Sequence, residues 1–426
     1  MTEAFLYFIW QFQYFQKNDL KTSAGQPIKV LQTGRLNSDS GADFQDSRLF
    51  IDGIEWFGSV EIHVKASDWH LHQHQSDAAY NNVILHVVWQ NDATIARPDG
   101  TALPVLELQN ITDPAVWKRY DTLLQTPETI PCGAQFGSVD ELVRVSMLDK
   151  TLTQRLERKA EVARQFFEQN QNDWEETAYQ LLAYNFGFKI NADPFLQLAR
   201  AVPLKILQKH RNNLPQVEAL FYGAAGLLAE PTDEYSRLLA REYKVLAAKY
   251  SLQNKQMQAL QWKFLRLRPA NFPTVRLAQF AQLVAQQASL FSVFINIEKT
   301  ADMLKRLQLT QSDYWQKHYV FGKETTAKVP AVGRASAENI LINTVVPLLV
   351  IYGQVRDQRA YLEKALEIVE SLPAERNHIT DNWEKLGVKI KTAYDSQGVI
   401  EWFNEFCSRK RCLACGVGVA LVRKQT

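Results

Sequence analysis

This chain has few cysteines and methionines, a small net charge and no long hydrophobic run. Four Cys and four Met occur among 426 residues, and 48 Lys and Arg nearly balance 46 Asp and Glu. The net charge therefore predicts no partner, and a nucleic-acid surface would have to come from local basic groups. No apolar run approaches the roughly 18 residues that a membrane span needs. The sequence thus predicts a protein without a membrane segment.

The N-terminus also lacks the features of a secretory signal. It has no basic first region and no cleavage site of small residues, and Glu3 occurs early. We therefore expect a cytoplasmic protein, a compartment in which thiols stay reduced. The apolar fraction of 46% is ordinary for a globular chain, but the length is too great for one small core. Two or three domains are expected.

Hydrophobic patterning changes along the chain and suggests where the domains lie. Residues 1–135 are predicted to form an α/β domain, with a mixed sheet flanked by helices. Its expected elements are a helix over Glu3–Phe15 and strands at Pro27–Leu31, Arg48–Ile51, Trp56–Lys65 and Val83–Trp89. Residues 136–405 read as a large all-α domain. Residues 406–426 form a Cys-rich tail that is predicted to pack back on the N-terminal domain.

The segment from Gly58 to Trp89 is the most unusual in composition. It holds five of the eight histidines, together with Glu61, Lys65, Asp77 and Tyr80. The five are His63, His70, His72, His74 and His86. Ionisable groups are costly to crowd together unless they share a metal, a proton or a charged ligand. This density indicates a site, although any one of these histidines taken alone is more often structural.

Alternation along the predicted strand gives that site a mechanism. Glu61, His63 and Lys65 project from one face of the strand. The hairpin at Asp52-Gly53 would bring Asp43 beside Glu61. Two neighbouring carboxylates repel unless a divalent cation bridges them, which predicts Mg²⁺ or Mn²⁺ between these two side chains. His63 or Lys65 would then activate a water for attack on a phosphodiester.

This arrangement resembles the PD-(D/E)xK nuclease superfamily. The order is helix, strand, strand with Asp43, strand with Glu61 and a basic residue, helix, strand. The resemblance implies a nuclease-like fold with Asp43, Glu61, His63 and Lys65 as catalytic residues. The chain departs from the pattern because Ala42 stands where proline is usual and His63 stands where lysine is usual. Lys65 lies two residues further along the same face.

Most of the chain also resembles a bacterial family of proteins of unknown function, number 2851. The resemblance rests on Gly34, Asn37, Gly41-x-Asp43-Phe44, the Trp56–His63 and Ser67–Tyr80 motifs, Val83–Val88 and the C-terminal cysteine segment. It implies no activity, so function has to be inferred from the site.

The later histidines allow a second interpretation of the same segment. His72 and His74, with Asp77 and His86, could hold zinc or iron, because imidazole and carboxylate suit those ions. Otherwise these four residues and Tyr80 would support the acidic site or contact the substrate.

The four cysteines predict a separate metal site. Cys407, Cys412 and Cys415 form a Cys-x4-Cys-x2-Cys segment, and Cys132 lies just beyond the nuclease-like region. Four thiolates serve either one zinc ion or one iron–sulfur cluster. Such a site would fasten the tail to the N-terminal domain.

The favoured function is therefore a metal-dependent nuclease or nuclease-derived DNA-processing protein. A catalytically inactive module that binds nucleic acid or a protein is one alternative, and a histidine-metal hydrolase of another substrate is the second. The expected partner is nucleic acid, with DNA favoured over RNA. The sequence predicts no oligomeric state.

Overall fold

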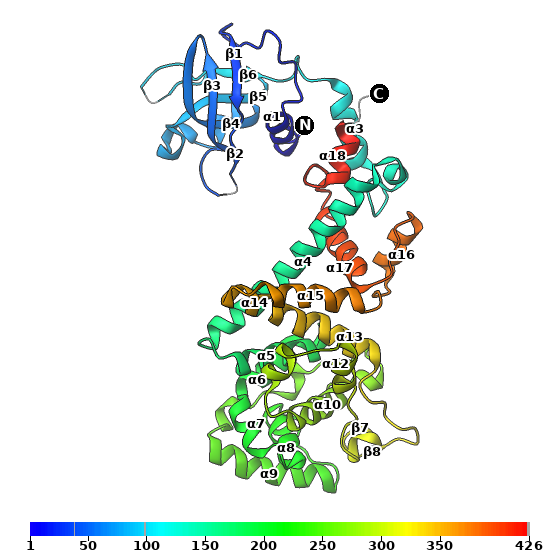
Figure 1. The fold of residues 1–426 in the computed structure, drawn as a ribbon. Coiled ribbons are helices and arrows are strands. Elements are labelled where there is room, and N and C mark those ends of the chain that lie inside the picture. Colours follow the sequence, from blue (N-terminus) through cyan, green and yellow to red (C-terminus); the bar gives the residue numbers. More distant parts are fainter. Residues whose placement is uncertain (38, 98, 424–426) are drawn as a thin grey trace. The chain divides into compact units, whose positions relative to one another are not determined.

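A computed structural model describes residues 1–37, 39–97 and 99–423 (Figure 1). It separates into two compact units, which we describe one at a time. The first comprises Met1–Met147 and Trp402–Thr426, and the second comprises Leu148–Glu401. The last three residues of the predicted tail, 424–426, lie outside the described part of the chain.

A mixed sheet forms the centre of the first unit, as predicted. Its order is β1-β3-β4-β5-β6, and β2 pairs with β3. The strands of the first half are antiparallel, whereas β4, β5 and β6 run parallel. The bounds are Ile28–Gln32 (β1), Arg35–Leu36 (β2), Phe44–Ile51 (β3), Ile54–Lys65 (β4), Val83–Gln90 (β5) and Val105–Glu107 (β6).

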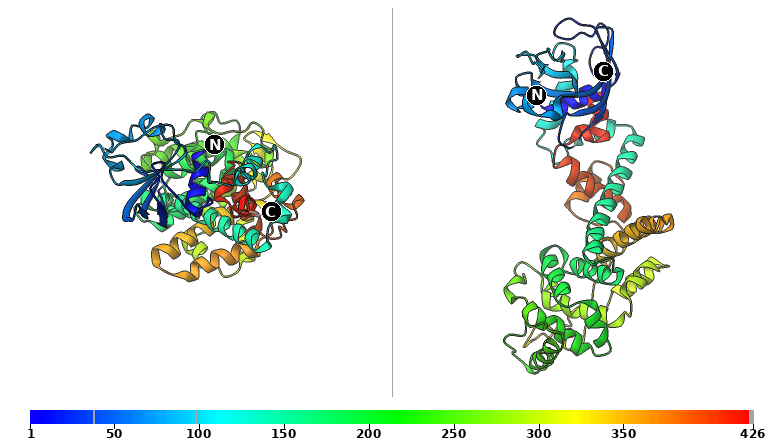
Figure 2. Two further views of the ribbon diagram at one scale, coloured as in Figure 1. Left: turned by 90° about the horizontal axis from the view of Figure 1, so that it is seen from above. Right: turned by 90° about the vertical axis from the view of Figure 1, so that its left-hand side faces the viewer.

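Helix α1 (Glu3–Phe12) packs against β4 and β5, and the two views of Figure 2 show it beside the sheet. The Thr2 side chain caps its first turn by accepting a hydrogen bond from the Phe5 N–H. The helix ends earlier than Phe15 because Gln13 adopts a left-handed conformation, with φ of 52°. Its polar residues Glu3 and Tyr7, four positions apart, lie on one face of the helix.

The β3–β4 hairpin forms as the sequence predicted. Asp52 and Gly53 have φ values of 53° and 79°, which suit a two-residue turn that matches strand twist. A bulge interrupts the pairing between Phe44 and Ser47, directly after Asp43. Gly34 is needed here, because its φ is +90° and a Cβ would lie 2.5 Å from the Gln45 carbonyl oxygen.

The loop before β3 fixes the position of Asp43. The Asn37 side-chain amide donates to the carbonyl oxygens of Asp39, Ser40 and Ala42. The Asn37 backbone N–H donates to the Asp43 carbonyl oxygen at 2.7 Å. The loop from Asp39 to Ala42 is thereby held by one side chain, and the Asp43 carboxylate is presented at the start of β3.

The crossover from β4 to β5 carries most of the histidine motif. It contains α2 (Asp68–Leu71) and two single 3₁₀ turns, η1 (His74–Ser76) and η2 (Ala78–Tyr80). At the end of this crossover, the backbone of Asn82 lies close to Gly58 of β4. A glycine is required there, because a Cβ would lie 2.6 Å from the Asn82 carbonyl oxygen.

Six further elements complete the first unit. They are α3 (Pro114–Gln125), η3 (Gly133–Ser138) and the start of α4 (Glu141–Gln169) from the N-terminal part, followed by η9 (Phe403–Cys407), η10 (Cys412–Ala414) and α18 (Gly416–Arg423) from the C-terminal part. The Arg119 side chain of α3 donates to the Val422 carbonyl oxygen of α18 at 2.9 Å. The C-terminal segment is thus bound directly to an N-terminal helix.

The second unit is helical, as expected, with one large apolar core. Only a short hairpin, β7 (His318–Val320) and β8 (Lys323–Glu324), interrupts the helices in its described residues. Besides most of α4, its helices are α5 (Trp174–Phe186), α6 (Phe188–Ala201), α7 (Leu204–His210), α8 (Leu214–Ala224), α9 (Glu234–Tyr250), α10 (Pro273–Gln286), α11 (Leu290–Ile295), α12 (Thr300–Leu307), α13 (Arg334–Ile340), α14 (Val346–Arg356), α15 (Arg359–Ser371), α16 (His378–Lys385) and α17 (Ala393–Trp402).

One helical stretch is more apolar than the sequence analysis recognised. Arg334–Arg356, which joins α13 to α14 through a π-helical turn, is long and apolar enough to cross a membrane. However, 67% of its most apolar window is buried inside the structure. A helix that is apolar all round and packed in this way is typical of a protein core.

Candidate metal centre

Glu61 lies at the centre of the site, in the middle of β4. Its side chain is only 5% exposed. The Asp43 backbone N–H donates to Oε2 at 3.1 Å, and Oε1 lies 3.2 Å from His74 Nε2 and 3.5 Å from His63 Nε2. Burial, reinforced by the nearby Asp43 carboxylate, raises the pKa of Glu61 to about 9. The partners within the chain therefore do not compensate a negative charge on this group.

His63 links two further imidazoles. Its Nδ1 lies 2.8 Å from His86 Nε2, and its Nε2 lies 3.1 Å from His72 Nδ1. The first contact exists because β4 and β5 run parallel and pair Glu61 with His86 in register. Burial lowers the pKa of His63 to about 2 and that of His86 to about 3, and neighbouring imidazoles add to both effects. The rings of His63 and His86 are thus held neutral, whereas the His72 side chain is exposed to solvent.

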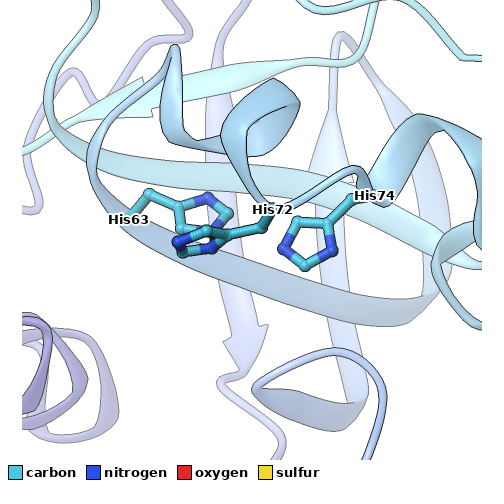
Figure 3. Close-up of side chains that lie close together, drawn as sticks. All are labelled: His63, His72 and His74. Carbon is cyan, nitrogen blue, oxygen red and sulfur yellow. Dashed lines mark hydrogen bonds between the residues drawn. The ribbon is translucent and has the colours of Figure 1, made fainter.

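His63, His72 and His74 form the one group of three or more possible metal ligands within 4.8 Å of each other among the described residues. Figure 3 shows the three rings gathered together, one from β4 and two from the chain that follows α2. The Nε2 atom of His74 is buried and makes no hydrogen bond. It is close to Glu61 Oε1 but not aligned with it, an arrangement more typical of two ligands than of a donor and its acceptor.

Aromatic rings hold the histidines in place. The Tyr80 ring stacks on His74 with 3.7 Å between the ring centroids, and Trp69 lies 5.3 Å from both His74 and His86. Asp77 caps η2 by accepting from the Ala79 N–H, and its charge favours protonation of His74. Burial nevertheless dominates and lowers the pKa of His74 to about 4. Tyr80 and Asp77 therefore lie beside the site, as support for His74.

Asp43 lies next to Glu61, and helix α1 adds two groups that the sequence analysis missed. The Tyr7 hydroxyl donates to Asp43 Oδ1 at 2.8 Å, and the Ile62 N–H donates to Oδ2 at 2.9 Å. Burial raises the pKa of Glu3, and the Asp43 charge raises it further, so Glu3 faces the same site. The spacing of Glu3 and Tyr7 on an otherwise apolar helix was the signal that could have found them.

Lys65 is placed differently from Glu61 and His63. It is the last residue of β4, and its side chain is exposed. The pKa of Asp92 is lowered mainly by the Ser67 N–H, and the Lys65 ammonium has only a small effect on it. His70 is likewise exposed. The structure gives Lys65 no position in the histidine group, and the expectation that it activates water gains no support.

The residues present fit a cation. Ligands about 2.0–2.1 Å from a tetrahedral ion lie roughly 3.4 Å apart. Three of the six separations among Glu61 Oε1, His63 Nε2, His72 Nδ1 and His74 Nε2 are 3.1, 3.2 and 3.5 Å. Glu61 thus lies close to His63 and His74, although it does not belong to the group whose three histidines all lie within 4.8 Å of one another. If His63 Nδ1 donates a hydrogen bond to His86 Nε2, the tautomer of His63 is fixed and the lone pair on its Nε2 is free to bind the ion. His86 thus acts as a supporting residue.

The four cysteines are present as thiols and are all buried. Cys132 precedes η3, Cys407 ends η9, Cys412 begins η10 and Cys415 follows it. All four belong to the first unit.

The fold and the site together define an α/β unit with a buried acid–histidine cluster, followed by a large helical unit. The chain belongs to the family described as protein of unknown function (DUF2851), whose model matches residues 3–378. The match ends before Cys407, so the cysteine segment, which was expected to share the resemblance, lies beyond it. Neither the curated proteins nor the solved structures gave a match.

Proposed function

We propose that this protein is a metal-dependent hydrolase of phosphodiester bonds, and that Glu61, His63, His72 and His74 hold the cation. The observation that carries the proposal is the group formed by His63, His72 and His74, whose ligand atoms lie within 4.8 Å of one another, with Glu61 Oε1 at 3.5 and 3.2 Å from His63 and His74. The buried, raised-pKa carboxyl of Glu61 is stabilised in its charged form only when a cation lies beside it.

The arrangement of acidic groups supports a phosphodiester substrate. Helix α1, the antiparallel strands β1, β3 and β4 and the parallel strand β5 follow one another in the order of the PD-(D/E)xK nucleases. Asp43 begins the second of these strands, and Glu61 and His63 lie on the third. Nuclease activity, with DNA as the favoured partner, remains a proposal that rests on this order and on the site.

Each residue has a distinct role in the proposed reaction. Glu61 supplies negative charge, and His63 and His74 supply buried nitrogen ligands. His72, the exposed member, lies where a substrate oxygen could replace it. Asp43 holds Glu61 through its N–H and provides a second carboxylate for accepting a proton from water. When bound, the cation would polarise a phosphoryl oxygen and lower the pKa of an attacking water.

The donor set also limits the choice of ion. Mg²⁺ prefers oxygen ligands, whereas imidazole suits first-row transition metals. Three imidazoles with one or two carboxylates therefore favour Mn²⁺, iron or Zn²⁺ over Mg²⁺. Of the two ions expected from the sequence, Mn²⁺ is the better fit.

The test compares nucleic-acid cleavage by the full chain and by two glutamine variants. After chelation, labelled single-stranded DNA, duplex DNA and RNA are incubated with Mn²⁺, Zn²⁺ or Mg²⁺. Glu61→Gln should reduce cleavage by more than about 100-fold, since even residues that only support a ligand cost 10- to 100-fold. Glu55→Gln is the matched control, because Glu55 lies on the same strand but is exposed and pairs with Arg48. It should leave the rate unchanged.

Two other outcomes would each replace the proposal. If the chain binds DNA with equal affinity in both variants and never cuts, it is an inactive binding module. If the chain holds a stoichiometric cation that Glu61→Gln removes, yet cuts no nucleic acid, it is a histidine-metal hydrolase of another substrate. The imidazole-rich ligand set is the observation that favours this second function.

A further inference from the structure

A second group of metal-ligating side chains lies in the same unit, separate from the acid–histidine cluster. Cys132, Cys407, Cys412 and Cys415 are each between 5% and 7% exposed. Three come from one short C-terminal segment, and Cys132 is about 270 residues away along the chain. The fold brings the distant thiol into the same unit as the other three.

Contacts around Trp402 connect the two parts of this group. Its indole N–H donates to Cys415 Sγ at 3.3 Å. Its ring centroid lies 6.0 Å from that of Phe136, in the 3₁₀ turn that directly follows Cys132. Cys407 closes the π-helical turn that starts directly after Trp402. Trp402 is fully buried, and it connects Cys415 with the turn that follows Cys132.

The pKa values of the thiols agree with this arrangement, because neighbouring cysteines affect them. Burial raises the pKa of Cys132 to about 12, and the charges of Cys415 and Cys412 raise it further. Burial also raises the pKa of Cys412 to about 11, with Cys415 adding to the effect and Lys410 opposing it. Lys410 lies between Cys407 and Cys412, and its positive charge favours the thiolate form of Cys412.

The spacing of the thiols distinguishes between two metals. A tetrahedral zinc ion holds its sulfur ligands at 2.3 Å, which places them about 3.8 Å apart. Among the described residues, the sole group of three ligands within 4.8 Å is the histidine group, so no three thiols approach that closely. A cluster of four irons holds its cysteines further apart, because each thiolate binds a different iron.

We propose that Cys132, Cys407, Cys412 and Cys415 bind one four-iron, four-sulfide cluster. Each thiol loses its proton to solvent when its sulfur binds iron. The Trp402 N–H then serves as a hydrogen bond to a ligand sulfur, a feature that tunes such clusters. The cluster joins the C-terminal segment to the end of the N-terminal part, in addition to the Arg119 bond to Val422.

The test is the metal content of the full chain purified without oxygen. Iron and acid-labile sulfide should each be present at about four per chain, with the broad visible absorption of iron–thiolate charge transfer. Cys132→Ser should abolish both. Ser408→Ala is the control, since Ser408 is exposed in the same segment and its hydroxyl donates to the nearby Asn404 carbonyl oxygen.

The metal content of the unmodified chain tests the proposed cluster even if Cys132→Ser does not fold. One zinc per chain without iron, or neither metal, would overturn the cluster. Iron that survives in Cys132→Ser would overturn the assignment of its ligands. The result is independent of the proposed hydrolase, because Mn²⁺ binding at the histidines does not involve these thiols.

Discussion

Two buried glutamates, one in each unit, are equally hidden from solvent but differ in what surrounds them. Glu401 is 1% exposed, and Arg158 binds both its carboxylate oxygens at 2.9 and 2.7 Å. Arg155 adds a third charged hydrogen bond at 3.0 Å. Although burial alone would raise the pKa of Glu401, the two guanidiniums outweigh it, and the pKa is lowered.

No guanidinium or ammonium group is among the partners of Glu61 described above. It has one backbone N–H and two buried imidazoles, and its pKa is raised to about 9. Burial of charge therefore does not distinguish a structural group from a functional one. What distinguishes them is whether the chain itself supplies the opposite charge. Glu401 is stabilised within the fold, whereas Glu61 requires a cation from outside.

The largest stability effect should come from Glu401. Replacing it with Gln leaves two guanidiniums beside a neutral amide, one of them largely buried. We expect the helical unit to lose about 3 kcal/mol of unfolding free energy, the low end for breaking a buried pair because Arg158 is half-exposed. Denaturant unfolding measures this. Glu363→Gln, at an exposed pair with Arg359, should cost no more than about 0.5 kcal/mol. Equal losses of unfolding free energy in Glu401→Gln and Glu363→Gln would contradict the role assigned to the guanidiniums around Glu401.

His86 tests whether the supporting residue behaves as a second layer around a ligand. It holds His63 through the 2.8 Å contact but does not belong to the close histidine group. His86→Gln should weaken Mn²⁺ binding by about 10- to 100-fold without abolishing it. Isothermal titration of the metal-free protein gives the value. An affinity equal to the wild type would show that His86 only fills the core.

The pH dependence of the metal-free protein should have two limbs. The pKa of Glu61 is raised from 4.5 to about 9, so its contribution to stability is full below pH 4.5 and is lost as the pH rises toward 9. The pKa values of His63, His74 and His86 are lowered from 6.5, so their contribution is full above pH 6.5 and is lost as the pH falls.

Thermal unfolding at several pH values would resolve the limbs. The alkaline loss should be absent in metal-free Glu61→Gln, and saturating Mn²⁺ should reverse it in the wild type, because the cation displaces the proton. If the melting temperatures of the wild type and of Glu61→Gln changed in parallel above pH 7, Glu61 would not be the group that causes the alkaline loss of stability.

The smallest effect is expected at Lys65. Because its side chain is exposed at the end of β4, Lys65→Ala should change the rate of hydrolysis by less than about 3-fold. Steady-state cleavage with Mn²⁺ measures it. A loss as large as that of Glu61→Gln would restore Lys65 to the catalytic role that the sequence suggested.

Local signals in the sequence predicted much of the first unit. The turn at Asp52-Gly53 set the β3–β4 hairpin, and alternation placed Glu61 and His63 on one face. Both depend on neighbouring residues only. The contact of His63 with His86 was not predictable in this way, since it depends on the parallel register of β4 and β5. Glu3 and Tyr7 were missed because the packing of α1 on the sheet brings them to Asp43.

The most direct test of the central claim is a titration of the metal-free chain with Mn²⁺, followed by electron paramagnetic resonance. Mn²⁺ is the suitable probe because it binds oxygen and imidazole and avoids thiolates. The account predicts one tightly bound ion per chain with imidazole nitrogen couplings, lost in Glu61→Gln and kept in Glu55→Gln. No bound ion in the wild type, or the same binding in both variants, would contradict it.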